Sequence, residues 1–334
     1  MQTLWFCVVS AMLAIYAILD GFDLGAGIIH LFLARSERDR RSVLSAAGRF
    51  WDGNEVWLLL AGFALYCAFP AVYESRRFYI SAIVLVWLLI IRGFATEFRG
   101  RMKSLRTRRS LDVIFGVTGI LLAFALGVAV GCLIRNVPPA GAPLVFDGFT
   151  ISCGVSAIAV LTLQSAAWMA LKTEGELPLR CRRLASAIWW TVLVSYAGVT
   201  AAAFNAQPHV VENLAANSWT GIFAVIAVAG LIGTRLCLNI GFDLGVFAGA
   251  SCVIAGLLTG TAAGQFPYLL APSGAGLPVL TVHNATAASG IAVSVFWWIP
   301  AFSLAVGYNL FMHRLARHRV EVKSGITAVH AHPI

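Results

Sequence analysis

Two stretches of the chain place carboxylates inside, or at the edge of, long apolar segments. The first reads Asp20-Gly-Phe-Asp23-Leu-Gly, and the second, Trp51-Asp-Gly-Asn-Glu-Val-Trp57, opens an apolar run. Moving a carboxylate into hydrocarbon costs at least about 2.5–3.5 kcal/mol, so acids retained there indicate a functional site, most often an ion or proton path. A fold for this chain must give these acids polar neighbours.

The composition identifies a membrane protein. Hydrophobic residues make up 59% of the 334 residues and charged residues only 12%, whereas about 25% of a soluble domain is charged. The net charge of +9 comes in short runs between apolar segments, so it reflects membrane topology and not a nucleic-acid-binding face. The first apolar segment has neither a cationic start nor a small-residue cleavage site, and we expect a retained span.

Nine apolar runs are long enough to cross the membrane, which takes about 20 residues in a helix. They are Leu4–Phe32, Trp51–Phe69, Phe78–Thr96, Leu111–Ile134, Phe149–Leu171, Leu184–Phe204, Trp219–Cys237, Gly245–Phe266 and Ala285–Met312. Open sheet edges cannot face lipid, so the sequence predicts an all-α polytopic membrane protein. We expect a single transmembrane domain over 1–334, with a first helical bundle carrying the acidic motifs at 1–134, the remaining helices at 135–312 and a cytoplasmic tail at 313–334.

The connections between the spans alternate in charge, which predicts the orientation because cytoplasmic loops retain Lys and Arg. One side carries only Arg76, Arg77 and Arg135. The other side carries the remaining clusters, which are Arg35 to Arg49, Arg99 to Arg109, Lys172 to Arg183, Arg235 and the tail from Arg314 to Lys323. We therefore expect a periplasmic N-terminus and a cytoplasmic C-terminus, as an odd number of spans requires.

The acids are spaced to act together. Asp20 and Asp23 share one helical face, as do Asp52 and Glu55. The connection between the first two spans is about 18 residues, which favours antiparallel neighbours and would bring the four acids to one depth as a proton relay. Two structural alternatives stay open. Asp52 and Glu55 could cap a helix N-terminus, and Asp23 could pair with Arg92 inside the bundle.

Other polar residues in the spans give weaker signals. Arg92 and Glu97, near the cytoplasmic end of the third span, are expected to extend toward the interface. His30 is interpreted as an unpaired interfacial histidine, since the neighbouring spans offer no second ligand for haem. The seven scattered cysteines have no C-x-x-C pair, so we expect neither a disulfide nor a metal site.

A second copy of Gly-Phe-Asp-Leu-Gly occurs at 241–245. It falls between two expected spans, where a tight turn with Asp243 as N-cap explains it better than an internal duplication does. A proton-coupled secondary transporter is the alternative function. It would need inverted repeats with paired interrupted helices, and the second Gly-Phe-Asp-Leu-Gly segment is the only sign of a repeat in the sequence. A purely structural scaffold, with the acids as interhelical ion pairs, is a third interpretation.

The order of the motifs resembles subunit II of cytochrome bd-type quinol oxidases. The matching segments are Asp20 to Gly27, Trp51 to Trp57, Arg92 to Arg99, Gln164 to Trp168 with Lys172 to Gly175, and Phe266 to Pro272. The compact length also resembles the cyanide-insensitive branch. His283-Asn284-Ala285 departs from the family, in which many members carry an acid before the last helix.

The resemblance implies a respiratory-chain subunit of two four-helix bundles plus one peripheral helix in the bacterial inner membrane. It implies a partner, subunit I, that carries haem b, haem d and the quinol-oxidising loop, and small single-helix accessory subunits in some members. It implies that Asp23 and Asp52, with Trp51 beside them, belong to a cytoplasmic proton pathway. Some members hold a structural quinone near the Trp-Asp motif, which would place Trp51, Trp57, Arg92 and Glu97 around it.

Overall fold

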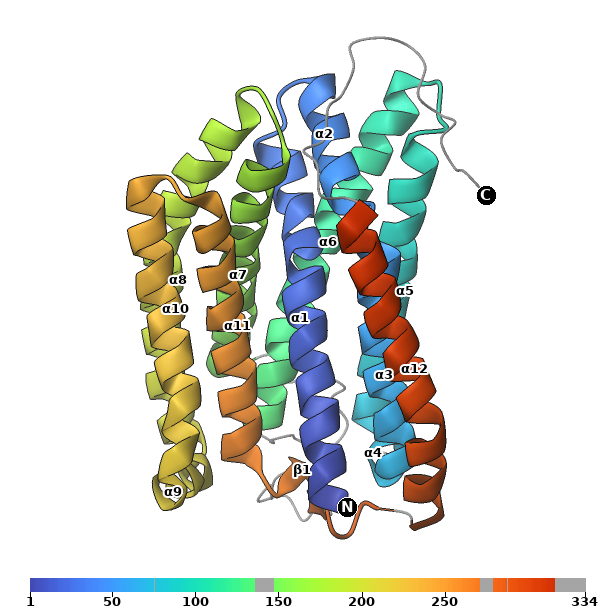
Figure 1. Cartoon of the computed structure of the whole chain (residues 1–334), viewed down its shortest axis with the longest axis vertical. Coiled ribbons are helices and arrows are strands. Elements are labelled where there is room, and N and C mark those ends of the chain that lie inside the picture. Colours follow the sequence, from blue (N-terminus) through green and yellow to red (C-terminus); the bar gives the residue numbers. More distant parts are fainter. Residues whose placement is uncertain (75, 136–146, 271–278, 287, 316–334) are drawn as a thin grey trace.

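Long helices lying roughly side by side build almost the whole molecule (Figure 1). The computed structural model describes residues 1–74, 76–135, 147–270, 279–286 and 288–315. The helices are α1 (Gln2–Phe32), α2 (Glu37–Ala47), α3 (Trp51–Ala68), α4 (Ala71–Glu74), α5 (Arg76–Arg99), α6 (Leu105–Arg135), α7 (Gly148–Lys172), α8 (Leu177–Ala206), α9 (Pro208–Ala216), α10 (Gly221–Ile240), α11 (Asp243–Gln265) and α12 (Ala288–Leu315), with a 3-10 turn η1 (Ser218–Thr220). A short antiparallel pair, β1 (Tyr268–Leu270) and β2 (Leu280–Thr281), completes the described part.

The all-α polytopic architecture predicted from the sequence is confirmed. Within the described ranges, 8 helices are long and apolar enough to cross a membrane, namely α1, α5, α6, α7, α8, α10, α11 and the last part of α12. The remaining expected span corresponds to α3, which has 18 residues and carries Asp52, Asn54 and Glu55 in its first turns. These polar residues make α3 less apolar than its neighbours, so a ninth span stays a prediction, as do the division into two bundles and the domain boundaries.

Helix α1 lies at the centre and packs against α3, α6, α7 and α11 (Figure 1). Glycines bring its backbone close to two of these neighbours. A Cβ atom on Gly25 would overlap the Leu161 carbonyl of α7, and one on Gly27 would lie 3.0 Å from the Phe115 carbonyl oxygen of α6. Small residues allow this approach where no hydrophobic force acts between helices in lipid, and the approach buries the α1 face that carries the acids.

The basic residues gather at one end of the molecule, which we call the basic end. Helix α1 runs toward it, α2 lies at it, and the N-terminus is at the opposite end (Figure 1). The amphipathic α2 begins with a capping box, in which the Ser36 side chain accepts from the Asp39 backbone N–H and Asp39 accepts from the Ser36 backbone. Most of the expected tail, residues 316–334, lies outside the described residues.

The repeated Gly-Phe-Asp-Leu-Gly segment forms the turn between α10 and α11. Gly241 has a φ of 73°, the left-handed conformation that ends α10. Asp243 is the first residue of α11 and Phe242 occupies the cap position, so the predicted turn is confirmed but the assignment of Asp243 as N-cap is wrong. Its carboxylate accepts instead from Arg182 of α8 at 2.6 and 2.8 Å. The echo therefore lies in a tight turn and not in an interrupted helix.

We predict that Gly25→Ala destabilises the protein by about 1–3 kcal/mol, because the added methyl overpacks the seam between α1 and α7. Thermal unfolding of the detergent-solubilised protein measures the change. Gly198→Ala in α8 is the matched control, since a Cβ there meets nothing within 4 Å. Equal melting temperatures for the two variants would contradict close packing at Gly25.

Candidate functional site

Two buried acids, one partly buried acid and one buried arginine meet between α1, α3 and α5. We call Asp20, Asp23, Glu55 and Arg92 the inner acid cluster. Arg92 of α5 is only 1% exposed, and its Nη2 atom lies 2.5 Å from Asp23 Oδ2. Its Nη1 atom lies 3.8 Å from Glu55 Oε1 of α3. The prediction that Arg92 extends to the interface is wrong, because its guanidinium is held inside the bundle by carboxylates from two helices.

Asp20 is the least compensated member of the inner acid cluster. Its side chain is fully buried, and it forms no ion pair with a cation among the described residues. Its polar neighbour is the buried hydroxyl of Tyr16, one turn earlier on α1, which donates to the carboxylate. A buried acid without a cation of its own is costly. The cluster holds three carboxylates for one guanidinium, so a proton shared among them lowers that cost.

Polar side chains of α3 and α12 fix the position of α3 beside the cluster. The Asn54 amide donates to the Leu19 carbonyl of α1 at 2.7 Å. The Asn309 amide of α12 donates to the Gly53 carbonyl at 3.1 Å. The predicted antiparallel pairing of the first two long helices is thus observed, with a hydrogen bond one residue before Asp20.

The tryptophans of the second motif lie on different sides of α3. The half-buried Trp51 ring packs on α5, where a Cβ on Gly93 would lie 3.0 Å from it. Trp57 is buried and contacts the Phe302 ring of α12 edge-on at 5.5 Å. Trp51 is therefore part of the packing between α3 and α5, whereas Trp57 is part of the packing between α3 and α12.

Two of the predicted site residues lie outside the cluster. Asp52 is exposed at the start of α3, on the side of the basic end. Glu97 is 54% exposed and pairs at 2.5 Å with Arg101, which lies just beyond the end of α5, as expected for an interfacial acid. Asp20, Asp23 and Glu55 are thus brought together, while Asp52 stands between them and the surface.

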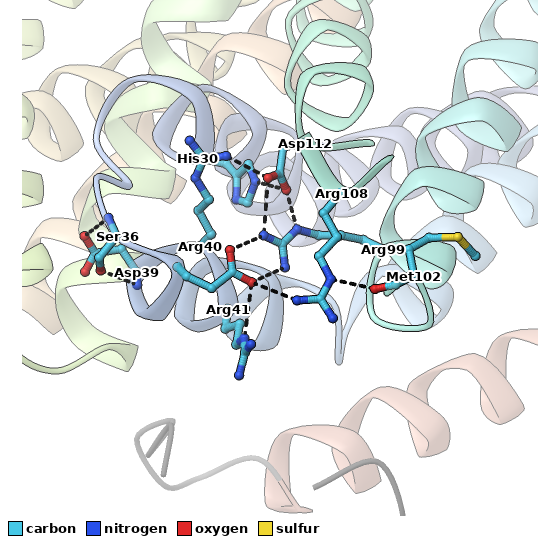
Figure 2. Close-up of polar contacts among 10 residues, drawn as sticks. His30, Ser36, Asp39, Arg40, Arg41, Arg99, Met102, Arg108 and Asp112 are labelled. Atoms are coloured by element: carbon cyan, nitrogen blue, oxygen red, sulfur yellow. Dashed lines mark hydrogen bonds and ion pairs between the residues drawn. The ribbon is translucent and has the colours of Figure 1, made fainter. Parts of the chain in front are cut away.

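A second set of charges lies at the basic end (Figure 2). We call His30, Glu37, Arg40, Arg99 and Asp112 the outer charge cluster. Asp112 of α6 accepts from Arg40 Nη1 at 2.7 Å and from two nitrogens of Arg99, and it lies 2.7 Å from His30 Nε2. Arg99 also donates to Glu37 at 3.0 and 3.3 Å. These bonds join α1, α2, α5 and α6.

The interpretation of His30 as an unpaired interfacial residue is wrong. The residue is 1% exposed and bonded to Asp112. Sequence reasoning missed Asp112 because it stands one residue inside the expected fourth span, next to a run of arginines that suggested a loop. The position of Asp112 in the sequence could have revealed the contact, because an acid inside the end of a span needs a polar partner. His30 lies near the end of the first span, at the same membrane depth.

A basic side chain of α8 connects the outer end of α2 to the second half of the molecule. Arg180 Nη2 donates to Asp39 at 2.8 Å, and its other terminal nitrogen donates to the Leu33 carbonyl. Burial by itself raises the pKa of Asp39, but the bonds from Arg180 and from the Ser36 backbone outweigh it and hold that pKa below its ordinary value.

The family-specific motifs of the second half pack against α1. Gln164 of α7 donates to the Ile18 carbonyl at 2.9 Å. The Trp168 indole donates to the Ala46 carbonyl at 3.0 Å and stacks on Phe22 at 4.3 Å.

Among the described residues, no group of three or more His, Cys, Asp or Glu side chains could hold a metal ion.

Comparison with known proteins places this arrangement in a family. The model of the family described as cytochrome bd terminal oxidase subunit II matches residues 1–316. The chain belongs to this family. The match covers all the residues of both clusters.

Curated members of the family are similar over part of their length. Cytochrome bd-I ubiquinol oxidase subunit 2 of Escherichia coli (strain K12) is 30% identical over 210 residues, which cover 59% of this chain and 55% of that protein. Cytochrome bd ubiquinol oxidase subunit 2 of Bacillus subtilis (strain 168) is 31% identical over 204 residues, 58% of this chain and 60% of that one. The matched part of the chain thus spans little more than half of these relatives.

A solved structure shows the same fold. One chain of the bd oxidase from Geobacillus thermodenitrificans superposes with a TM-score of 0.74 at 18% identity, covering 94% of this chain and 98% of that one. The cytochrome bd subunit II assignment therefore agrees with the helix arrangement over nearly the whole chain.

We predict that Arg92→Gln destabilises the protein by about 3–5 kcal/mol, because it leaves the Asp23 carboxylate buried without a cation. The double variant Asp23→Asn with Arg92→Gln should recover much of that loss, since it removes both charges. Thermal unfolding of the solubilised protein measures both. A double variant as unstable as the sum of the single ones would show that Asp23 and Arg92 do not stabilise each other.

We predict that Asp39→Asn lowers stability at neutral pH by about 1 kcal/mol. The folded pKa of Asp39 is lowered, so its contribution is present above the unfolded pKa of about 3.9 and is lost as the pH falls through the folded value. The difference in melting temperature from wild type should shrink between pH 7 and about pH 3. Glu212→Gln, at an exposed position, serves as control. A difference that does not change with pH would contradict the ion pair with Arg180.

Proposed function

We propose that this chain is the non-haem subunit of a quinol-oxidising, oxygen-reducing complex of the bacterial inner membrane. In this proposal it packs against a subunit I that holds haem b and haem d, and its acids carry protons from the cytoplasmic side. The observation that supports this role best is Asp20, fully buried and without an ion-pair partner of its own among the described residues, beside the Asp23–Arg92 ion pair.

The chemistry of the complex explains why such acids are retained. Reduction of oxygen to water consumes protons, and a site enclosed in lipid can receive them only through groups that bind and release them. Three carboxylates that share one guanidinium can pass a proton among themselves at lower cost than an isolated buried acid can. The exposed Asp52, nearer the basic end, is the entry acid in this proposal, and Glu55 and Asp23 lead from it to Asp20.

The position of the acids also suggests where subunit I packs. Asp52 is exposed and Glu55 is 20% exposed on α3. At membrane depth, acyl chains are a poor neighbour for either carboxylate, so another protein is the better cover. The helices α3, α5 and α12 also expose large apolar side chains, among them Leu59, Phe63, Trp87, Phe94 and Phe311. We therefore place the contact with subunit I on the face formed by α3, α5 and α12.

The proposed orientation, with the basic end in the cytoplasm, follows from the positions of Lys and Arg. Two other features of the proposal rest on the family resemblance alone. A quinone near the Trp-Asp motif would lie beside the half-buried Trp51 ring. Single-helix accessory subunits, like the quinone, stay predictions.

We predict that Asp20→Asn lowers quinol-driven oxygen uptake by at least about tenfold, because the amide keeps the shape of the side chain but cannot carry a proton. Asp52→Asn should slow uptake in the same direction. Rates are expressed per haem, from the optical spectrum of the purified complex, so that a loss of assembly is not counted as a loss of turnover. Glu97→Gln is the control, since Glu97 lies on the exposed face of α5. Wild-type turnover in Asp20→Asn would remove Asp20 from any essential proton path.

A further inference from the structure

His30 is a buried titratable group that the proposed route through the inner acid cluster does not use. Its side chain is fully enclosed, with Nε2 2.7 Å from Asp112 Oδ1. The other ring nitrogen, Nδ1, has no hydrogen-bond partner among the described residues. A purely structural histidine would be expected to satisfy both nitrogens, so the free nitrogen calls for an explanation.

The surroundings of Asp112 determine which nitrogen carries the proton. The Asp112 carboxylate already accepts from Arg40 and Arg99, so it has no proton to offer and accepts from His30 as well. His30 Nε2 is therefore the donor, and in the neutral ring Nδ1 holds the lone pair. This is the arrangement by which a carboxylate orients a histidine that binds and releases protons.

His30 also lies in line with the inner acid cluster. Asp23 and His30 are seven residues apart on α1, two helical turns or about 10 Å along the same face. Gly27 stands between them, and its missing side chain lets α6 approach. The Phe115 ring of α6 bridges this interval, since the His30 ring meets it edge-on at 5.4 Å and the Arg92 guanidinium lies 5.6 Å from its centre.

The contact with Asp112 is what allows His30 to take an additional proton. The groups that face it are Asp112 from α6, Glu37 and Arg40 from α2, Arg99 from α5, and Arg92 across the Phe115 ring. Arg41 and Arg108 also contact Glu37, at 3.3 and 3.8 Å, so guanidinium groups outnumber carboxylates there. The imidazolium would therefore be stabilised by its direct contact with Asp112 and not by the net charge of its surroundings.

We propose that His30 is a proton-transfer residue between the basic end and the inner acid cluster. The inference rests on the proposed function, because it supplies that route with a second entry. A proton from water at the basic end binds to the Nδ1 lone pair, and Asp112 stabilises the imidazolium. The proton then leaves Nδ1 for the Asp23 carboxylate through intervening water, since about 10 Å exceeds hydrogen-bond reach. The ring returns to its neutral form.

The test compares two His30 variants in the purified complex. His30→Gln keeps a side-chain N–H that can donate to Asp112 but cannot carry a proton, so turnover per haem should fall about tenfold or more. His30→Ala should be equally slow and should recover with added imidazole, but not with thiophene, a ring of similar size that lacks a basic nitrogen. Wild-type turnover in His30→Gln, or equal recovery with both rings, would overturn the proposal in favour of a structural role.

The same measurements separate this inference from the proposed function. A slow Asp20→Asn with a normal His30→Gln would refute only the role of His30. Normal turnover in both Asp20→Asn and His30→Gln would refute the proton route itself. Proton uptake after a single turnover, measured with a pH-sensitive dye, should also be slower in His30→Gln than in the wild type. An unchanged uptake rate would contradict the proposal.

Discussion

The ion pair between Asp23 and Arg92 is the constraint on which the rest of the structure depends. Both side chains are withdrawn from water inside a bundle of apolar helices, where removing either partner leaves a buried charge. The pair therefore fixes the depth of α1 relative to α5. Glycines on α1 make room for the close packing, and the remaining acids gather around the one guanidinium at that depth.

The two clusters solve different electrostatic problems. The outer charge cluster pairs its carboxylates with arginines near the basic end, where bonds from four helices hold it in place. The inner acid cluster has an excess of carboxylates and lies where compensation is scarce. The Phe115 ring contacts one member of each cluster, His30 and Arg92.

Much of this arrangement could be predicted from the sequence. The apolar runs predicted the helices, and the short connection after the first span predicted that α1 and α3 are neighbours. Asp20, Asp23, Asp52 and Glu55 were expected to converge; Asp20, Asp23 and Glu55 do, whereas Asp52 lies exposed at the start of α3. The direction of the Arg92 side chain could not be predicted, because a long side chain near a helix end can reach the interface or turn into the bundle. Only the position of Asp23 on the facing helix decides which of the two occurs.

The outer charge cluster was beyond sequence reasoning for a related reason. Its members come from four separate helices and no two of them form a local motif that indicates contact. His30 has no second histidine at a spacing that would indicate a pair of ligands. Asp112 follows a run of arginines, which suggested a charged loop and not a buried ion pair. Only the packing of α6 against α1, set by glycines on both helices, brings the two side chains together.

Two amide side chains fix the position of α1 next to Asp20. Gln164 and Asn54 hold two consecutive carbonyls, those of Ile18 and Leu19, from helices packed on different sides of α1. Rolling or sliding α1 would break both bonds. Uncharged groups therefore fix α1 immediately before Asp20. The Asp20 carboxyl can gain or lose a proton while the surrounding helices keep their positions.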